Sequence, residues 1–443
     1  MATMKPIQIG LLGAGTVARG VVQVLTRNQE EICGRAGRGI EIAAVAARDP
    51  ARARASLGDA VTITDDFDAL VRRPDIDIVV ELIGGTTRAR ELVLAALAAG
   101  KPVVTANKAL LAVHGTEIFE AARERGLAVG FEAAVAGGVP IIKALREGLT
   151  ANRIHWIAGI INGTTNFILS EMRAKGLDFG VVLEEAQRLG YAEADPTFDI
   201  EGVDAANKAA SMSAIAFGTP VQFERAHVEG ITQLQAADIR YAEQLGYRIK
   251  LLGITKRRED AHGSGIELRV HPTLIPATRL IANVEGAMNA VVVHGDAVGP
   301  TLYYGKGAGA EPTGSAVVAD LVDVTRLITA DPDHRVPHLA FQPHAVSATP
   351  ILPIEQVITS FYLRLQVADE TGVLADITRI LAAHEISIGA VLQRETGEGE
   401  RQTDLIILTH DTLEGRMNAA LAQIQALPTV LAPIVRIRKE ELS

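Results

Sequence analysis

The feature that most constrains the fold is a glycine turn between a short apolar segment and an amphipathic one. Ile7–Leu12 is typical of a strand, and the residues after the turn have helical spacing, with apolar side chains at Val17, Val21, Val24 and Leu25. Gly13 permits a tight turn, Gly15 lets the backbone approach a pyrophosphate, and Ala18 permits close helix–strand packing. The helix N-terminus then faces the anion. The pattern predicts a dinucleotide-binding turn, with an ordinary tight turn as the alternative, and its candidate cofactor contacts are Gly13, Ala14, Gly15, Thr16 and Val17.

Residues 1–140 alternate between apolar runs and helical stretches. The expected strands are Ile40–Ala47, Ile76–Ile83, Pro102–Thr105 and Leu127–Val135, and the expected helices include Arg88–Ala99 and Gly115–Arg125. Strands that are apolar throughout and alternate with helices indicate a parallel sheet covered on both faces. The region therefore predicts a Rossmann-type, doubly wound α/β domain.

The pattern changes in residues 141–330, where helices come before strands. The expected helices are Gly180–Leu189, Asp204–Phe217, Ala236–Leu245 and Ser315–Ile328, and the expected strands are Ile249–Thr255, Gly265–Thr273 and Asn289–Gly295, followed by a glycine-rich turn at Tyr304–Gly309. This order predicts an α+β domain around a mixed or antiparallel sheet. Its last helix either completes this domain or returns to the first one.

Five prolines with little periodicity mark residues 331–357 as a linker. Residues 358–443 then form a unit of their own in the order βαββαβ, which is the ferredoxin-like arrangement. Its expected elements are Ser360–Val367, Gly372–His384, Ser387–Arg394, Thr403–His410, Glu414–Ala426 and Val430–Arg438.

Composition excludes several classes of protein. Hydrophobic residues make up 48% of the 443 residues, which excludes a largely disordered chain. The net charge of −10 argues against a nucleic-acid partner. Cys33 is the single cysteine, so no intrachain disulfide forms and a reducing compartment fits. Met1–Lys5 does not begin a signal peptide, and no apolar run approaches the roughly 18 residues of a membrane span. We therefore expect a cytoplasmic protein.

The residues after the second strand, Ala47-Arg48-Asp49, bear on the choice of cofactor. An Arg at this position accommodates the 2′-phosphate of NADP, whereas an acidic residue binds the ribose 2′-OH of NAD. Arg48 favours NADP and Asp49 leaves NAD open. The alternative is that Arg48 is a solvated loop residue.

Two further segments carry candidate ligands. Lys108 follows the strand Pro102–Thr105 at the edge where open α/β sheets bind ligands, so it either contacts cofactor or substrate or begins a helix as a solvated residue. The segment Glu132–Pro140 contains two glycines and a proline that force a bend and expose main-chain carbonyls. Together with Glu132 these oxygens can hold a monovalent cation. The alternative for this segment is a turn between two domains.

The densest polar set lies between Gly190 and Lys208. Asp204 and Lys208 are i and i+4 on one helix, so they share a face. A surface ion pair of this kind contributes only about 0.2–0.5 kcal/mol. The same face continues through apolar residues, however, which predicts a partly buried Lys208. A buried lysine loses its charge readily and can act as a general acid or base.

Together these motifs resemble homoserine dehydrogenase over residues 7 to about 330. The residues that carry the resemblance are the glycine turn, Thr105–Lys108, Glu132–Ile141, Ile161–Asn166, Gly190–Pro196, Asp199-x-x-Gly-x-Asp204-x-x-x-Lys208 and Tyr303–Gly309. The tail, with Asp369-Glu-Thr-Gly372-Val-Leu374 at its first strand–helix junction, resembles an ACT domain, a small amino-acid-sensing module. The resemblance to these two families does not extend to residues 331–357.

The resemblance implies an NAD(P)-dependent interconversion of L-homoserine and L-aspartate 4-semialdehyde in threonine, methionine and isoleucine biosynthesis. It implies that Lys208 transfers the proton and that Lys108 lies near substrate and cofactor. Gly190, Glu193 and Asp204 would position homoserine, with Asp199 in support. Glu132 and the carbonyls of Val135, Gly137 and Val139 would form a sodium-type site. Gly305 would close over the nicotinamide, although Lys306 replaces a residue that is often Pro in relatives.

The turn in the tail predicts regulation by an amino acid, and the uncovered sheet edges predict assembly into an oligomer. Backbone N–H groups of the turn Gly372–Leu374 can hold an α-carboxylate while Asp369 meets the ammonium group. The resemblance suggests inhibition by an end product such as threonine, and a plain oligomerisation module is the alternative. Both the middle sheet and the ferredoxin-like sheet have edges that need covering, which predicts a homodimer or homotetramer.

Two other functions stay open at this point. One is a non-catalytic sensor that binds a nucleotide and an amino acid, although such a sensor has no need of a proton-transferring lysine. The other is a dehydrogenase with the same two-domain plan and a different amino-acid or sugar substrate.

Overall fold

The first third of the chain builds a six-stranded parallel sheet with the strand order β3-β2-β1-β4-β5-β6. The computed structural model describes residues 5–59, 61–260, 263–329, 335–393 and 401–442. The strands are β1 (Ile7–Leu12), β2 (Ile40–Ala46), β3 (Ile63–Thr64), β4 (Ile78–Glu81), β5 (Val103–Thr105) and β6 (Val129–Gly130). The order reverses between β1 and β4, which confirms the predicted doubly wound domain and places ligands at the carboxyl ends of these strands.

Six helices connect these strands, and some boundaries differ from expectation. They are α1 (Thr16–Arg27), α2 (Gln29–Ala36), α3 (Pro50–Leu57), α4 (Phe67–Arg72), α5 (Thr87–Ala98) and α6 (Lys108–Glu124). Helix α2 was not among the elements predicted from the sequence. The expected strand Leu127–Val135 was too long, because only Val129–Gly130 pairs with β5 and Glu132–Ala134 turns into a 3₁₀ helix.

The middle region forms a sheet in the order β12-β11-β7-β9-β10, and these neighbours are antiparallel. The strands are β7 (Ile154–Ile160), β8 (His227–Val228, parallel to β10), β9 (Tyr247–Asp260), β10 (Gly263–Pro276), β11 (Met288–Gly295) and β12 (Gly299–Lys306). The helices are α7 (Ile141–Lys143), α8 (Gly163–Lys175), α9 (Phe179–Arg188), α10 (Thr197–Ile200), α11 (Val203–Phe217) and α12 (Ala236–Gln244). Residues 304–306 were expected in a turn but belong to β12, and β7 was not predicted.

Helix α13 (Ala310–Leu327) leaves the middle sheet and packs against α1 of the first domain. Two glycines allow this crossing: a Cβ on Gly20 would lie 1.8 Å from the carbonyl oxygen of Ala310, and one on Gly314 would lie 2.6 Å from the carbonyl carbon of Gly20. The apolar face of α13 then completes the core around β1 and α1, including Val317 and Leu321.

The tail folds as predicted into a ferredoxin-like unit with the strand order β17-β13-β15-β14. Its elements are β13 (Ile358–Ala368), α14 (Val373–Ala383), β14 (Ile388–Gln393), β15 (Gln402–Thr409), β16 (Thr412–Leu413), α15 (Glu414–Gln425) and β17 (Val435–Lys439). Part of the expected strand Ser387–Arg394 lies outside the described residues. The expected last strand, Val430–Arg438, begins only at Val435.

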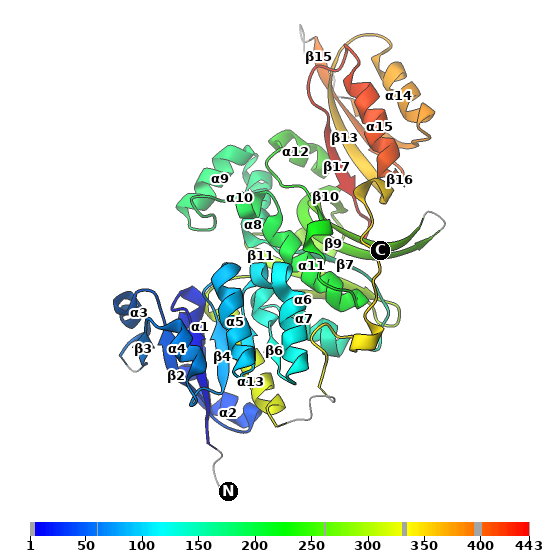
Figure 1. Cartoon of the computed structure of the whole chain (residues 1–443). Coiled ribbons are helices and arrows are strands. Elements are labelled where there is room, and N and C mark those ends of the chain that lie inside the picture. Colours follow the sequence, from blue (N-terminus) through cyan, green and yellow to red (C-terminus); the bar gives the residue numbers. More distant parts are fainter. Residues whose placement is uncertain (1–4, 60, 261–262, 330–334, 394–400, 443) are drawn as a thin grey trace.

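The two later sheets are not separate, because β17 pairs in parallel with β10 at Thr273↔Arg438 and Leu274↔Lys439. From the sequence, both sheets were expected to have edges that another chain covers. For β10 and β17 this expectation is wrong, because these two edge strands pair with each other within the chain. Figure 1 shows the result: the first domain lies at one end, the tail at the other, and the middle sheet lies between them.

The residues predicted as a linker pack closely against the body of the protein. We call residues 335–357 the strap. The His338 Nε2 atom accepts the Val129 N–H (3.1 Å), and the Ser347 N–H donates to the Gly218 carbonyl at the end of α11 (2.7 Å). Further along, Ile266 of β10 exchanges main-chain bonds with Pro350 and Leu352 (2.9 and 2.8 Å). At its end, the Val357 carbonyl accepts the Glu414 N–H of the tail (2.9 Å), so the strap touches all three folded parts of the chain.

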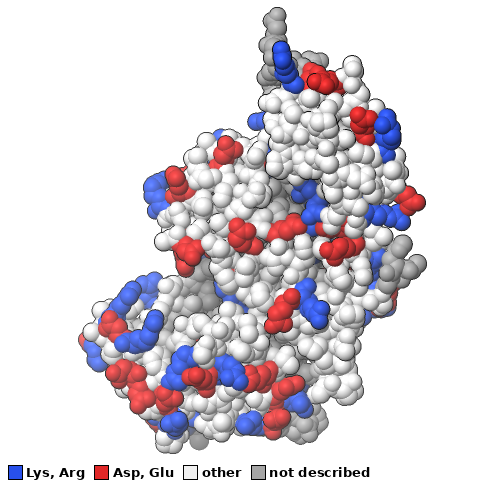
Figure 2. Space-filling view, turned by 45° about the horizontal axis from the view of Figure 1, so that its top comes forward, with Lys and Arg blue, Asp and Glu red and all other residues white. Residues whose placement is uncertain are grey.

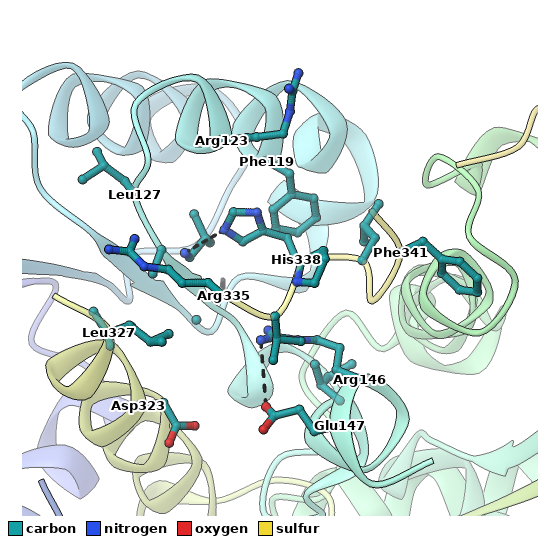
Figure 3. A pocket seen from close by; sticks show the side chains of 18 of the residues that line it. Phe119, Arg123, Leu127, Arg146, Glu147, Asp323, Leu327, Arg335, His338 and Phe341 are labelled. Atoms are coloured by element: carbon teal, nitrogen blue, oxygen red, sulfur yellow. Dashed lines mark hydrogen bonds and ion pairs between the residues drawn. The ribbon is translucent and has the colours of Figure 1, made fainter. Parts of the chain in front are cut away.

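A cavity of about 680 Å³ lies beneath the strap, between α6, the π-helical turn Ala144–Gly148 and α13. Figure 3 shows His338 beside Phe119, and their rings stack at 5.4 Å. Arg146 lies across the cavity and approaches Glu147 at 4.0 Å.

On the face shown in Figure 2, acidic and basic side chains are intermingled, without a continuous basic stripe. None of the helices in the described part of the chain combines the length and apolar character that a membrane crossing requires.

The strap is expected to lose stability in acid through His338. Burial, with Arg146 and Arg335 nearby, lowers the pKa of His338 to about 3, below the ordinary 6.5. Between these values the unfolded chain takes up a proton that the folded chain excludes, so stability falls as pH drops below 6.5. The loss is at most about 1.4 kcal/mol per pH unit. Thermal unfolding from pH 7.5 to 4 should show a smaller decline in His338→Gln.

The matched control is His344→Gln, because His344 is an exposed residue of the same strap. This variant should follow the native pH dependence. Equal curves for His338→Gln and the native chain would show that His338 does not carry the effect.

Candidate active site

The glycine turn after β1 lines a cavity of about 420 Å³. Gly13 has φ +109°, and a Cβ there would lie 2.8 Å from the Leu82 carbonyl oxygen. A Cβ on Gly15, the residue before α1, would meet nothing within 4 Å, so the backbone is open to a ligand. Ala14 and Thr16 also line the cavity, whereas Val17 packs against the core of the domain. The turn fits the diphosphate of a dinucleotide at a helix N-terminus.

The end of β2 supplies the far wall of this cavity. Arg48 and Asp49 line it together with Arg19 and Arg52. The Asp49 Oδ1 atom accepts the Arg52 N–H (3.0 Å) and so caps α3. One carboxylate oxygen is thus already engaged by the protein, while three guanidinium groups share the cavity.

The predicted lysines meet at one buried carboxylate. Helix α11 carries Asp204, which is 1% exposed, and the Lys208 Nζ atom donates to its Oδ2 atom (2.6 Å) and to the Ile161 carbonyl (2.7 Å). Lys108, the first residue of α6 in the other domain, forms an ion pair with the Oδ1 atom of Asp204. Asn107 caps α6 by accepting the Leu110 N–H (3.1 Å) and so fixes where Lys108 begins the helix. A single carboxylate therefore holds two lysines from two domains.

Burial and charge shift the pKa values of this group in a useful direction. Burial lowers the pKa of Lys208 below 10.5, although Asp204 opposes the shift and Lys108 adds to it. Burial by itself would raise the pKa of Asp204, but the charges of Lys208 and Lys108 hold it below 3.8. Asp204 is therefore ionised, while Lys208 can lose its proton more easily than a lysine in water.

Asn162 joins a second carboxylate to this group, a role the sequence prediction missed. Its Nδ2 atom donates to both Asp199 (2.7 Å) and Asp204 (2.8 Å), and its Oδ1 atom caps α8 by accepting the Thr165 N–H (2.9 Å). Thr164 donates its hydroxyl to Asp199 (3.2 Å). The motif Ile161–Asn166 was part of the resemblance, but spacing alone does not show that its amide faces α11.

The segment after α9 lies beside this cluster. Gly190 has φ +78°, and the Tyr191 carbonyl accepts the Thr164 hydroxyl (2.8 Å). The Glu193 side chain is exposed, and its carbonyl accepts the Gln187 Nε2 group (3.0 Å). The structure thus brings together Lys108, Lys208, Asp199 and Asp204, and leaves Glu193 at the surface.

The loop between the domains places its carbonyls against the turn after β12. Both Glu132 carboxylate oxygens accept main-chain N–H groups, from Ile142 and Lys143 (2.8 Å each). The Val139 carbonyl accepts the Ile141 N–H (2.8 Å), whereas no hydrogen bond within the described residues reaches the carbonyls of Val135 and Gly137. The free oxygens in this loop are therefore main-chain carbonyls and not the Glu132 side chain.

The same loop contacts the residues expected over the nicotinamide. The Gly138 N–H donates to the Lys306 carbonyl (3.0 Å). A Cβ on Gly305 would lie 3.2 Å from the Val139 side chain, and one on Gly137 would lie 2.3 Å from the Gly307 carbonyl oxygen. The candidate cation loop and the turn that begins at Gly305 therefore pack as one unit.

A buried carboxylate at the end of β4 was also missed. Glu81 is fully buried and lies beside Thr105 of β5 at the carboxyl edge of the sheet. Its signal in the sequence is a single acidic residue inside the apolar run Ile76–Ile83.

In the tail, Asp369, Gly372 and Leu374 lie at the junction of β13 and α14, and all three are exposed. Gly372 has φ +97° and precedes the first helical residue, Val373. The Asp369 N–H donates to the Arg401 carbonyl (3.0 Å).

Comparison with known proteins agrees across the whole chain. Residues 13–132 match the NAD binding domain of homoserine dehydrogenase, residues 140–322 match the homoserine dehydrogenase family, and residues 361–429 match the ACT domain. The homoserine dehydrogenase of Pseudomonas aeruginosa is 60% identical over 440 residues, covering 99% of this chain and 100% of the relative. The chain belongs to the homoserine dehydrogenase family.

Solved structures support the same assignment. A homoserine dehydrogenase from Thiobacillus denitrificans is 65% identical with a TM-score of 0.95, and each chain covers 100% of the other. A hyperthermophilic archaeal homoserine dehydrogenase in complex with NADPH is 26% identical with a TM-score of 0.62, covering 72% of this chain and 98% of its own. The chain is thus an NAD(P)-dependent oxidoreductase of amino-acid biosynthesis with an ACT domain. Neither the non-catalytic sensor nor the dehydrogenase with a different substrate agrees with this result.

Proposed function

We propose that Lys208 transfers the proton in the interconversion of L-homoserine and L-aspartate 4-semialdehyde, with Lys108 facing it across the reacting groups. The observation that carries this proposal is the buried Asp204 carboxylate between the two lysines, one from each domain. The bound nicotinamide supplies the hydride acceptor in oxidation and the hydride donor in reduction. The carbinol carbon loses hydride while the hydroxyl oxygen loses its proton.

The neutral Lys208 Nζ atom accepts the hydroxyl proton during oxidation, and its ammonium form returns the proton to the oxygen during reduction. A lowered pKa suits both directions, because the neutral amine then forms at a lower pH than it does for a lysine in water. Lys108 keeps a positive charge near the substrate oxygen, where it stabilises developing negative charge. Asp204 orients both ammonium groups.

Carboxylates around this group suit the substrate ammonium. We assign Asp199 and Asp204 to one side of the substrate, and Glu193 with the backbone of Gly190 to the other. The Asn162 amide bridges Asp199 and Asp204 by donating to both carboxylates. These assignments depend on the proposal for Lys208. If homoserine binds away from Lys208, both the assignments and that proposal are wrong.

The cofactor proposed for this chain is NADP, with NAD as a weaker alternative. Three observations support this choice: Arg48, Arg19 and Arg52 share the cavity, Asp49 caps α3, and one relative carries NADPH. A 2′-phosphate gains charge-assisted hydrogen bonds from guanidinium groups. Gly305 and the turn after it would cover the nicotinamide.

A sodium-type cation is proposed at the loop between the domains, held by main-chain oxygens of Val135, Gly137 and Val139. Hard cations prefer such oxygen ligands. Glu132 then acts by capping Ile142 and Lys143 and fixing the loop. Loss of activity when choline replaces sodium, without loss of NADPH binding, tests this assignment.

The proposed division of the chain is residues 1–140 for cofactor, 141–330 for substrate and dimerisation, 331–357 for connection and 358–443 for control, with α13 returning to the first part. We propose a homodimer or homotetramer in the cytoplasm. Sedimentation equilibrium distinguishes these assemblies, and a monomer would contradict the proposal.

The effector proposed for the tail is an amino acid such as threonine. Backbone N–H groups at Gly372–Leu374 would hold its carboxylate, and Asp369 would meet its ammonium group. These three residues are exposed, as an effector site requires.

Replacing Lys208 by Ala is expected to lower kcat for homoserine oxidation by several orders of magnitude, with a small change in NADPH affinity. In the native chain kcat/KM should rise with pH until Lys208 is neutral, with a midpoint below 10.5. Lys175→Ala is the control, because Lys175 pairs with Glu171 and Glu185 on the surface. Near-native turnover in Lys208→Ala would remove this residue from the chemistry.

Replacing Arg48 by Ala is expected to raise the KM for NADP about tenfold and to leave the KM for NAD nearly unchanged, since the lost contact is a charge-assisted hydrogen bond. Initial rates with each cofactor measure this. Arg54→Ala is the control, because Arg54 lies on the helix that follows Arg48, α3, but outside the cavity lining. An equal change for both cofactors would contradict recognition of a 2′-phosphate.

Replacing Asp369 by Ala in the full-length chain is expected to weaken inhibition by threonine about tenfold or more, with unchanged kcat, because a charge-assisted contact is lost. Asp376→Ala is the control, since Asp376 pairs with Arg379 on α14. Native enzyme that is insensitive to threonine and related amino acids would refute the effector assignment.

A further inference from the structure

Glu81 stands where the two functional loops of the first domain meet. It is the last residue of β4 and is fully buried. Its neighbours in the sheet are Leu12, which leads into the glycine turn, and Thr105, which leads towards Lys108. A buried carboxylate costs several kcal/mol unless it is fully hydrogen-bonded, so an apolar residue would serve packing alone better.

The Glu81 carboxylate collects four donors from both loops. Its Oε1 atom accepts the N–H groups of Ile83 (2.9 Å) and Gly84 (3.2 Å) and the Asn107 Nδ2 group (3.4 Å). Its Oε2 atom accepts the Thr105 hydroxyl (2.6 Å). Burial raises the pKa of Glu81, and these four hydrogen bonds oppose that rise.

One pair of donors, the N–H groups of Ile83 and Gly84, lies in the turn after β4. Leu82 and Ile83 line the cofactor cavity, and the Leu82 N–H donates to the Leu12 carbonyl (2.8 Å), beside the glycine turn. Glu81 therefore fixes the turn after β4 against the dinucleotide site.

The other pair leads to Lys108. The Thr105 hydroxyl also accepts the Asn107 N–H (3.0 Å), and the Asn107 side chain donates to the Gly85 carbonyl (2.7 Å) while capping α6. Lys108 is the next residue and reaches Asp204 from there. The position of the Lys108 backbone thus depends on groups that Glu81 holds.

We infer that Glu81 is a positioning residue that fixes Lys108 relative to the cofactor-contacting turn after β4. This inference rests on the function proposed above for Lys108 and for the glycine-turn cavity. Glu81 acts through Thr105 and Asn107 and does not touch the reacting atoms. A displacement of about 1 Å at a catalytic group can cost about 10²-fold in rate, which sets the scale of its effect.

A double-mutant cycle in the full-length chain tests this role. The variants are Glu81→Gln, Lys108→Ala and the combination, assayed for kcat and KM in homoserine oxidation, NADPH affinity by fluorescence, and melting temperature. Glu81→Gln keeps the shape of the side chain and removes the charge that four donors share. It should lower kcat by about 10- to 100-fold. In the Lys108→Ala background the same change should alter kcat by no more than about twofold, because residues in one network are not additive.

Two further variants make the test specific. Thr105→Val removes the hydroxyl between Glu81 and Asn107 at nearly constant volume, and it should show the same coupling to Lys108 even if Glu81→Gln folds poorly. Glu91→Gln is the matched control, because Glu91 is an exposed residue of the next helix, α5, paired with Arg88. It should leave kcat and the melting temperature unchanged.

The outcomes separate this inference from the proposed function. If Lys108→Ala lowers kcat, and Glu81→Gln lowers kcat by the same factor with and without Lys108, the two residues act independently. Glu81 then has a general structural role and the inference is wrong. Native kcat in Glu81→Gln or Thr105→Val would also overturn it. If Lys108→Ala has native kcat, the proposed role of Lys108 fails, and the positioning role of Glu81 fails with it.

Discussion

The contact on which the rest of the site depends is the buried Asp204 carboxylate between Lys108 and Lys208. A carboxylate that is 1% exposed needs hydrogen-bond donors or positive charge to be stable as an anion, and for Asp204 the protein takes one lysine from each of two domains. This requirement explains why α6 must begin at residue 108 and why α11 is buried along its length. Burial lowers the pKa of Lys208, and the charge of Asp204 opposes part of that shift.

The carboxyl edge of the first sheet must stay open to a dinucleotide and still hold its loops in place. Glycine keeps the edge open, because Gly15 leaves space where another residue would have a side chain. Buried polar groups hold the loops, because Thr105 and Asn107 donate hydrogen bonds to Glu81. A network of this kind is stabilising only when every member is satisfied, so its residues are coupled to one another.

Local patterns predicted the fold of the two outer domains, and tertiary contacts decided what they missed. The parallel strands and the βαββαβ tail follow from periodicity that each segment carries itself. Strand β12 was missed because it lies at an edge, alternates between partly buried and exposed residues and contains Gly299, Pro300 and Gly305, which are typical of turns. The pairing of β10 with β17 joins residues about 165 positions apart and has no local signal.

In the site, the i, i+4 pair of Asp204 and Lys208 was predictable from one helix. The shared amide of Asn162 was not, because it depends on how α8 meets α11.

The junction between the tail and the middle sheet argues that the ACT module is part of one folded body. Arg269 and Arg438 are each 1% exposed, and their partners lie across the junction: Arg269 binds Glu440 (2.6 Å) and Arg438 binds Glu229 (2.7 Å). Removing one partner of a buried pair costs about 3–5 kcal/mol, because the other charge is left uncompensated. Cutting the chain before β13 would remove Glu440 from Arg269 and Arg438 from Glu229, and it would expose the edge of β10. Arg269 would then keep its ion pair with Glu267, and Glu229 would keep His227. The activity of a shortened chain would therefore report this damage along with any loss of inhibition, which is why point changes in the whole chain are the cleaner way to separate control from catalysis.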